Sequence, residues 1–299
     1  MAANRNADLN ALPLFAAVAE TGTFTAAAQQ LGVAKAKVSL DIARLEAQLG
    51  VTLFARTTRR VSLTDAGQAL YARCIPPLRG LQDALAQTGG EGELVGTLRI
   101  AAAVDYAAQT VSRAVAAFAA RHPRLDIDLR TSDRVVDMLR EGIDVALRMG
   151  WLRDSSLRAT RLGEFDQYLT ASPAYLARAP RITRPEDLAQ HDWIALSVLP
   201  APLTWKFTSA KGQRRIVRVT TRLRTDSVGA LRALLLSGSG ITALDQFSTA
   251  EALRSGELVR VLPGWTLPRG GVYAVYPPGR HVPAKVRAFI DFYSAWLPG

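Results

Sequence analysis

The strongest constraint on the fold lies in the first 63 residues, where three short helical patterns precede an alternating, arginine-rich segment. Helices are predicted over 10–20, 25–31 and 34–49, because apolar residues recur on one face of each and capping residues or glycines stand at their limits. Residues 51–63 alternate in the manner of a short two-stranded hairpin. Short helices joined by a turn and followed by such a hairpin predict a winged helix-turn-helix that binds double-stranded DNA. Asn10 and Thr25 are the predicted N-terminal caps, and Gly32 and Gly50 are predicted to end the second and third helices.

The helix over 34–49 carries the expected DNA-contacting face. Its buried stripe begins at Val38, so Leu40 lies at the centre of the opposite face, which is largely apolar. Such a face can touch thymine methyl groups, so Leu40 is either a thymine reader or a tolerated surface residue. Asp41 either pairs with Lys37 one turn earlier or accepts a hydrogen bond from cytosine. The residues expected to contact DNA are Thr25, Lys35, Ala36, Lys37, Ser39, Leu40, Arg44, Arg56, Arg59 and Arg60, the last three at the hairpin tip.

A long helix is predicted next, capped by Thr64 and running to about Gln87. Pro76 and Pro77 are expected to kink or interrupt it, because each proline removes a backbone donor. Glycines within 89–92 predict a flexible linker. A seam along the helix favours pairing with a second copy of the chain; its residues are Leu70, Cys74, Leu78, Leu81 and Leu85.

From residue 94 the pattern changes to alternating strands and helices at the spacing of βαβ units, which predicts α/β architecture with a mostly parallel sheet. The expected strands are 98–102, 125–130, 145–149 and 272–276, and the expected helices are 106–121, 134–141 and 227–237.

Charge favours an anionic partner, nucleic acid first, since the chain carries a formal net charge of +11. Seven basic residues and no acid lie between Lys206 and Arg224. Period-2 alternation over 214–224 predicts one strand with a basic face, either simply solvated or attracting anions.

Other classes of protein are disfavoured. The single cysteine, Cys74, excludes a disulfide framework and fits a reducing cytoplasm. Neither an apolar run of membrane-spanning length nor a secretory signal is found, so a cytoplasmic protein without a membrane segment is expected. His122, His191 and His281 lack metal-ligand spacing, and no nucleotide-binding loop has the right context, so no metal, cofactor or catalytic residue is predicted.

The motifs "ETGTFTAAAQQLGV" at 20–33 and "LEAQLGVTLFARTTRRVSLTDAG" at 45–67 resemble the N-terminal domain of LysR-type transcriptional regulators. The stretches "GTLRIAA", "DVALRMG", "ASPAYLAR" and "GSGITAL" farther along are similar to that family's effector domain. The chain departs from the family pattern in the recognition helix, where the capping serine is missing, Leu40 replaces a basic base reader and Asp41 replaces a glutamine. It departs again at Pro76 and Pro77, which lie inside the helix that the family uses for dimerisation. The resemblance covers essentially the whole chain.

The resemblance implies a homodimer or homotetramer joined through the 64–87 helix, with a small-molecule effector held between two subdomains of a type 2 periplasmic-binding-protein-like fold. It implies a DNA-binding domain over 1–63, a linker and dimerisation helix over 64–93, and an effector domain over 94–299. Within the effector domain, subdomain I covers about 94–165 and 270–299, and subdomain II about 166–269.

Family ligands usually bind through a hydroxyl and helix N-terminal amides after the first strand, but the matching stretch 102–105 has no hydroxyl here. Asp105 either caps the following helix or faces the cleft, where it would disfavour a carboxylate. The expected function is ligand-responsive transcriptional regulation; the alternative is a solute-binding protein or enzyme with a basic N-terminal extension. The residues expected to line the effector site are Ala103, Val104, Asp105, Thr131, Ser132, Arg148, Ser197, Phe207, Asp226 and Ile241.

Overall fold

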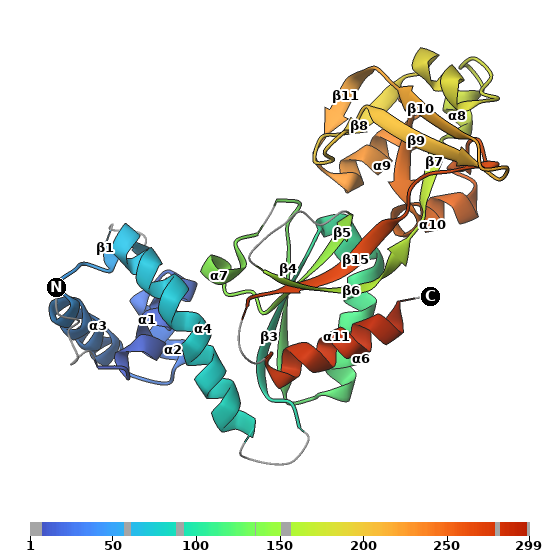
Figure 1. Cartoon of the computed structure of the whole chain (residues 1–299). Coiled ribbons are helices and arrows are strands. Elements are labelled where there is room, and N and C mark those ends of the chain that lie inside the picture. Colours follow the sequence, from blue (N-terminus) through green and yellow to red (C-terminus); the bar gives the residue numbers. More distant parts are fainter. Residues whose placement is uncertain are drawn as a thin grey trace. The chain divides into compact units, whose positions relative to one another are not determined.

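The computed structural model of the chain forms two compact units, Met1–Gly96 with Asp137–Ile143, and Thr97–Val136 with Asp144–Gly299. Figure 1 shows the N-terminal helices in blue to cyan and the sheets of the second unit from teal to red. Within the described residues, no single helix is long and apolar enough to cross a bilayer, although the bent pair formed by the first two helices together reaches that length and composition. The described residues are 8–56, 61–87, 93–134, 136–150, 157–278 and 282–297.

The N-terminal unit is a helix-turn-helix with a hairpin and a long helix. Its elements are α1 (Ala11–Thr21), α2 (Phe24–Gln30), α3 (Lys35–Leu49), β1 (Phe54–Arg56), β2 (Val61–Leu63) and α4 (Asp65–Gln87). Strands β1 and β2 pair antiparallel, which confirms the predicted hairpin. Phe15 and Val18 of α1, Ile42 and Leu45 of α3, and Phe54 of β1 are all buried in one core. The apolar stripes predicted from the sequence therefore meet inside this unit.

The limits of all three helices agree with the predictions to within one residue, but two of the predicted N-terminal caps differ. Gly32 and Gly50 adopt the left-handed conformation that ends a helix, with φ of 64° and 67°. Thr23, and not Thr25, caps α2, because its hydroxyl accepts a hydrogen bond from the Ala26 amide at 3.1 Å. Asn10 precedes α1 but its side chain makes no capping hydrogen bond.

Helix α4 is one continuous helix across Pro76 and Pro77, so the expected interruption does not occur, whereas the alternative, a kink, remains a prediction. Two prolines remove two of the helix's backbone hydrogen bonds, and their fixed φ is compatible with helical geometry, so the remaining bonds carry the helix through. Thr64 caps α4 as predicted, since its hydroxyl accepts a hydrogen bond from the Gly67 amide at 3.0 Å.

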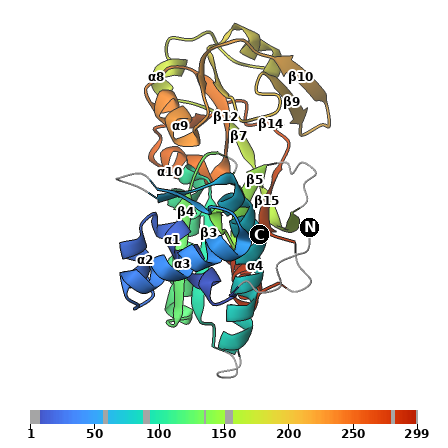
Figure 2. The same ribbon diagram turned by 90° about the vertical axis from the view of Figure 1, so that its left-hand side faces the viewer.

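The second unit contains two five-stranded sheets and one three-stranded sheet, in the orders β4-β3-β5-β15-β6, β11-β8-β12-β7-β13 and β10-β9-β14. The chain leaves the first sheet between β6 and β7 and returns between β14 and β15. Figure 2 shows β9, β10 and β14 together. The strands are β3 (Gly96–Ala102), β4 (Leu125–Thr131), β5 (Val145–Gly150), β6 (Arg158–Phe165), β7 (Gln167–Ala171), β8 (Trp193–Leu196), β9 (Thr204–Ser209), β10 (Arg214–Arg218), β11 (Thr221–Thr225), β12 (Ile241–Asp245), β13 (Val259–Arg260), β14 (Trp265–Thr266) and β15 (Gly270–Tyr276).

The prediction of a mostly parallel sheet was wrong, because both large sheets are mixed. Strand β5 is parallel to β3 but antiparallel to β15, and β12 is parallel to β8 but antiparallel to β7. The connections from β6 to β7 and from β14 to β15 lead from one sheet to another and contain no crossover helix. The rule that a βαβ unit places its two strands parallel in one sheet therefore does not apply to these strands.

Helices pack beside these sheets, and Figure 1 shows α6 and α11 side by side. Phe118 of α6 contacts Phe289 and Phe292 of α11 with ring centres 5.3 and 5.2 Å apart. Two aromatic residues of the last helix therefore pack on α6. The helices of the second unit are α5 (Val104–Tyr106), a π-helical segment (Ala107–Val111), α6 (Ser112–Arg121), α8 (Pro173–Leu176), α9 (Val228–Leu236), α10 (Gln246–Ser255) and α11 (Ala284–Trp296), whereas α7 (Met138–Glu141) belongs to the first unit.

Two expected elements are shorter than predicted. The helix predicted over 134–141 is reduced to α7, because Asp137 caps it by accepting a hydrogen bond from the Arg140 amide. The single strand predicted over 214–224 is two strands in different sheets, β10 paired with β9 and β11 paired with β8. The alternation of basic and apolar residues continues from β10 into β11, because both strands have a face exposed to solvent. The pattern therefore did not reveal that the chain changes sheet between them.

Candidate nucleic-acid interface and effector cavity

Helix α3 presents the face predicted to contact DNA. Val38, Ile42 and Leu45 are buried, which turns the opposite side outward. Leu40 is 51% exposed at the centre of that side, and Ala36 and Ala43 beside it are exposed as well. Lys35, Lys37 and Arg44 are exposed around this apolar strip, and Ser39 is half-buried. An apolar centre with a cationic border suits thymine methyl contacts flanked by phosphate contacts.

Asp41 lies between two of these cations. Lys37 Nζ is 2.8 Å from Asp41 Oδ2, and an Arg44 guanidinium nitrogen is 3.7 Å from Asp41 Oδ1. The predicted pairing of Asp41 with Lys37 is therefore present, and Arg44 joins it from the next turn. Since the carboxylate is turned toward two neighbours on its own helix, it offsets part of their positive charge.

The hairpin is fixed to α3 by a contact that the sequence analysis missed. Glu46 Oε1 accepts hydrogen bonds from the Leu53 and Phe54 amides at 2.7 and 3.2 Å, so the last turns of α3 hold the start of the hairpin. Gly67 on α4 packs so closely that an added Cβ would lie 2.1 Å from the Leu53 carbonyl oxygen. Residues Arg59 and Arg60 lie outside the described residues, and of Arg56 only the backbone, in β1, is described.

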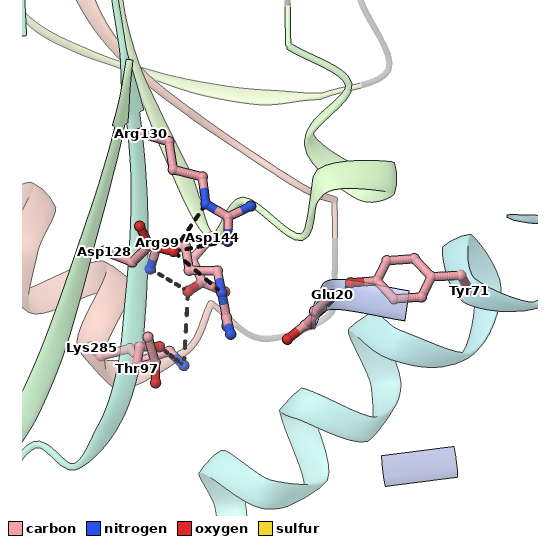
Figure 3. Close-up of polar contacts among 8 residues, drawn as sticks. All are labelled: Glu20, Tyr71, Thr97, Arg99, Asp128, Arg130, Asp144 and Lys285. Carbon is pink, nitrogen blue, oxygen red and sulfur yellow. Dashed lines mark hydrogen bonds and ion pairs between the residues drawn. The ribbon is translucent and has the colours of Figure 1, made fainter. Parts of the chain in front are cut away.

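A hydrogen bond joins α1 to α4 at the hydrophobic core of the N-terminal unit. The Tyr71 hydroxyl donates to Glu20 Oε1 at 2.9 Å (Figure 3), and the Tyr71 ring meets Phe15 edge-on with centres 6.3 Å apart. Thr25 is the second residue of α2 and is exposed. Its predicted contact with DNA remains a prediction, since only its capping role was wrong.

The second unit contains a cavity of about 300 Å³ that is partly open to solvent. Its wall includes the carboxyl-terminal ends of β3 and β5, the segment that follows β4, and residues from β8, β12 and the start of α9 and α10. Ligands of α/β proteins commonly bind outside the carboxyl ends of parallel strands, and β3 and β5 are parallel here. The volume is at the small end of the range for ligand pockets, about 300–1,000 Å³.

The opposite ends of β3 and β5 are locked by polar contacts (Figure 3). The buried Lys285 of α11 donates from Nζ to the Thr97 carbonyl at 2.8 Å and lies 4.0 Å from Asp144. Asp144 in turn accepts a hydrogen bond from the Arg99 amide at 2.8 Å. These contacts join the first halves of both strands to each other and to α11, at the ends away from the cavity.

Half of the predicted effector residues meet at the cavity; they are Ala103, Asp105, Ser132, Arg148 and Asp226. The other five lie elsewhere. Phe207 and Ile241 are buried in the core of the second and third sheets. Val104 and Thr131 are exposed, and Ser197 donates its hydroxyl to the Thr225 carbonyl at 3.0 Å.

Asp105 does not cap the following helix, because the N-cap of α5 is Ala103 and the carboxylate lies elsewhere. The Asp105 side chain is 6% exposed and lines the cavity, with Oδ1 3.4 Å from an Arg232 guanidinium nitrogen of α9. The capping alternative was wrong, and the cleft-facing alternative describes this residue.

Asp245 is the most informative cavity residue that the sequence analysis missed. Its carboxylate accepts hydrogen bonds from the Phe247 and Ser248 amides and from the Ser248 hydroxyl, at 2.7 to 3.0 Å. Burial, opposed by those hydrogen bonds and assisted by the nearby negative charge of Asp105, raises the pKa of Asp245. An aspartate directly after an apolar strand and before a helical pattern was the available signal.

Arg148 of β5 lines the same cavity half-buried, and burial lowers the pKa of its guanidinium. Among the described residues it forms no ion pair. Within those residues no group of three His, Cys, Asp or Glu side chains could hold a metal ion. The site is therefore a mixed-charge pocket on an apolar wall.

Comparison with known proteins covers both units. A family model described as the LysR substrate binding domain matches residues 91–298, and one described as a bacterial regulatory helix-turn-helix protein of the lysR family matches residues 9–68. The chain is 42% identical to the HTH-type transcriptional regulator PtxR of Pseudomonas aeruginosa, over 95% of this chain and 91% of PtxR. It is 31% identical to the HTH-type transcriptional activator AaeR of Escherichia coli, over 95% of this chain and 92% of AaeR.

Solved structures show the same arrangement of domains along the chain. The full-length virulence activator AphB of Vibrio cholerae matches with a TM-score of 0.59 and 31% identity, over 97% of this chain and 99% of AphB. CrgA of Neisseria meningitidis, a LysR-type transcriptional regulator, matches with a TM-score of 0.60 and 30% identity, over 96% and 98% of the two chains. With its helix-turn-helix, its two-part α/β domain and these relatives, the chain belongs to the LysR family of transcriptional regulators.

Proposed function

We propose that this regulator is a homo-oligomer that binds DNA through α3 and the hairpin, and that a small molecule in the cavity changes its DNA binding. The observation that carries the proposal is the exposed face of α3, where cations border an apolar strip. Residues 1–63 would bind DNA, 64–93 would join the subunits, and 94–299 would bind the effector between subdomains 94–165 with 270–299 and 166–269. The protein acts as a cytoplasmic regulator, without a cofactor and not as an enzyme.

DNA binding rests largely on phosphate contacts and shape, because the α3 face offers few hydrogen-bonding groups to base edges. Five candidate cations per subunit are Lys35, Lys37, Arg56, Arg59 and Arg60. If six to ten of them in a dimer reach phosphates, affinity should fall by about 10³ or more between 50 and 200 mM salt. A mobility-shift titration on DNA from upstream of its own gene tests this. A salt response near zero would contradict the assignment of α3 and the hairpin as the DNA-binding surface.

Subunit pairing is assigned to α4. Leu70 and Leu78 of the predicted seam are partly buried against the core of their own unit, whereas Leu81 is 59% exposed. Leu81 is therefore the described leucine of the seam that is left to pair with a second copy, and the side chain of Leu85 lies outside the described residues. Light scattering of the full chain at micromolar concentration should give a dimer or tetramer, which would bring two helix-turn-helix units onto a pseudo-palindromic site. A monomer would contradict this proposal.

The effector role is supported by the cavity of about 300 Å³ and its mixed-charge lining. A ligand that binds only the native state raises its melting temperature. A thermal-shift screen of small metabolites on the full chain, followed by the mobility-shift assay with each hit, tests the role. A hit that stabilises the protein and also changes DNA affinity supports it; stabilisation without any change in DNA binding contradicts regulation by that site.

A further inference from the structure

Two charged side chains of the cavity, Asp105 and Arg148, lack a full set of hydrogen-bond or ion-pair partners among the described residues, and their charges have opposite signs. Asp105 Oδ1 has one partner, Arg232, at the long distance of 3.4 Å, and Oδ2 is buried with no hydrogen-bond partner among the described residues. Within the described part of the chain, the Nε of Arg232 is also buried without a hydrogen-bond partner, so the pair is incomplete on both sides. A buried carboxylate oxygen without a donor is costly, so a ligand that supplies a donor gains free energy.

The other carboxylates of the cavity have less need of a hydrogen-bond donor from a ligand. Asp245 is already satisfied by the two amides and the hydroxyl at the start of α10. Asp133 accepts a hydrogen bond from the Val104 amide at 3.0 Å, and Asp226 is exposed to solvent. Asp105 is therefore the carboxylate that a cationic group in the cavity would complete.

Arg148 is a cation that lacks an anionic partner in the described part of the chain, so it requires a ligand group of the opposite charge to the one that Asp105 requires. Its guanidinium is half-buried in the cavity wall and has no ion pair within the described part of the chain, whereas Arg134, the other cation of the lining, is exposed. Desolvation lowers the pKa of Arg148. A guanidinium in this setting favours a bidentate carboxylate partner.

The register of the sheet brings these two groups to one end of neighbouring strands. Ala102 at the end of β3 lies opposite Leu147 of β5, so Arg148 is the next residue of β5 and Asp105 follows three residues beyond β3. Most of the remaining wall is apolar, with Tyr106, Phe165, Leu196 and Val228 among its residues. We propose that the effector is an amphoteric molecule of amino-acid type, with a protonated amine paired with Asp105, a carboxylate paired with Arg148 and an apolar body against this wall.

This inference rests on the proposed effector role of the cavity. It differs from a plain carboxylate ligand, which the family-like stretch after β3 would hold through a hydroxyl that this chain lacks. A purely anionic ligand would leave Asp105 Oδ2 uncompensated and would add a second negative charge beside it. A purely cationic ligand would leave Arg148 without its counter-charge.

The test uses matched probes on the full chain, with melting temperature and calorimetric affinity as readouts. The first set is leucine, isoamylamine, 4-methylpentanoate and 4-methylpentanamide; the second is phenylalanine, phenethylamine, 3-phenylpropanoate and 3-phenylpropanamide. The amphoteric member of at least one set should bind about tenfold or more tightly than its amine-only, acid-only and neutral counterparts, as expected for a lost charge-assisted hydrogen bond. A ranking with the acid-only or neutral probe first overturns the inference, as does the absence of binding by both amphoteric probes.

Variants assign the two charges. Asp105→Asn should remove the advantage of the amphoteric probe over the acid-only probe, and Arg148→Gln its advantage over the amine-only probe. Asp291→Asn and Arg287→Gln, at exposed positions of α11, remove the same charges away from the cavity and should leave the ranking unchanged. If Asp105→Asn does not fold, the ranking on the unaltered protein still decides. Binding by an acid-only or neutral probe that alters DNA affinity would preserve the proposed effector role while refuting the charge assignment.

Discussion

Replacing Asp41 with asparagine tests how the α3 surface meets DNA. Asp41 holds Lys37 at 2.8 Å and Arg44 at 3.7 Å, so part of the positive charge on this face is offset within the helix. Asp41→Asn removes the negative charge without removing the side chain's bulk. Exposed pairs at this spacing contribute about 0.2–0.5 kcal/mol to a helix, so folding should be little affected.

The effect on DNA binding should be larger than the effect on stability. Each additional phosphate contact steepens the dependence of log affinity on log salt by about 0.9. One cation released in each subunit of a dimer therefore steepens it by about 1.8, which corresponds to roughly tenfold more loss of affinity over a fourfold rise in salt. Affinity at low salt should rise for operator and unrelated DNA alike, because phosphate contacts carry no sequence information.

The assay is a fluorescence-anisotropy titration of operator and scrambled DNA from 50 to 200 mM salt. Asp65→Asn is the matched control, since it removes the same charge from the exposed first turn of α4. An unchanged salt slope with weaker binding at one base pair would refute the reasoning. That result would mean that Asp41 leaves its ion pairs and accepts a hydrogen bond from cytosine.

Three further predictions concern other parts of the chain. Leu40→Arg should shift base preference toward guanine by about 1–3 kcal/mol in a selection on randomised half-sites, whereas equal strengthening on all sequences would show that Leu40 is not a reader. Gly67→Ala should lower the melting temperature and DNA affinity, because its Cβ would lie 2.1 Å from the Leu53 carbonyl oxygen; Gly80→Ala, with open space around it, should be neutral or stabilising. Burial lowers the pKa of His191 below 6.5, so the unfolded chain takes up a proton first and the free energy of unfolding should fall as pH drops below 6.5. His191→Gln should flatten that decline in denaturant titrations, and an equally steep decline would refute the assignment.

Local signals determined the N-terminal unit. The signals that define this unit each act within a few residues; they are the helical periodicity, the left-handed glycines at 32 and 50 and the Thr64 cap. The amino-acid sequence was therefore enough to predict α3 and the hairpin. The errors there were also local: Thr23 and Thr25 are both plausible caps, and only the direction of the Thr23 hydroxyl decides between them.

Tertiary structure decided the composition of the cavity. Asp105, Arg148 and Asp245 come from three segments far apart in the sequence. The pairing of β3 with β5 brings the first two together, and Asp245 reaches the cavity from β12 of the second sheet. Phe207 and Ile241 were expected to line the effector site, but both are buried in the core of the second and third sheets. Whether a strand residue lines a cavity depends on which sheet covers that face, and that is fixed by pairing between distant segments.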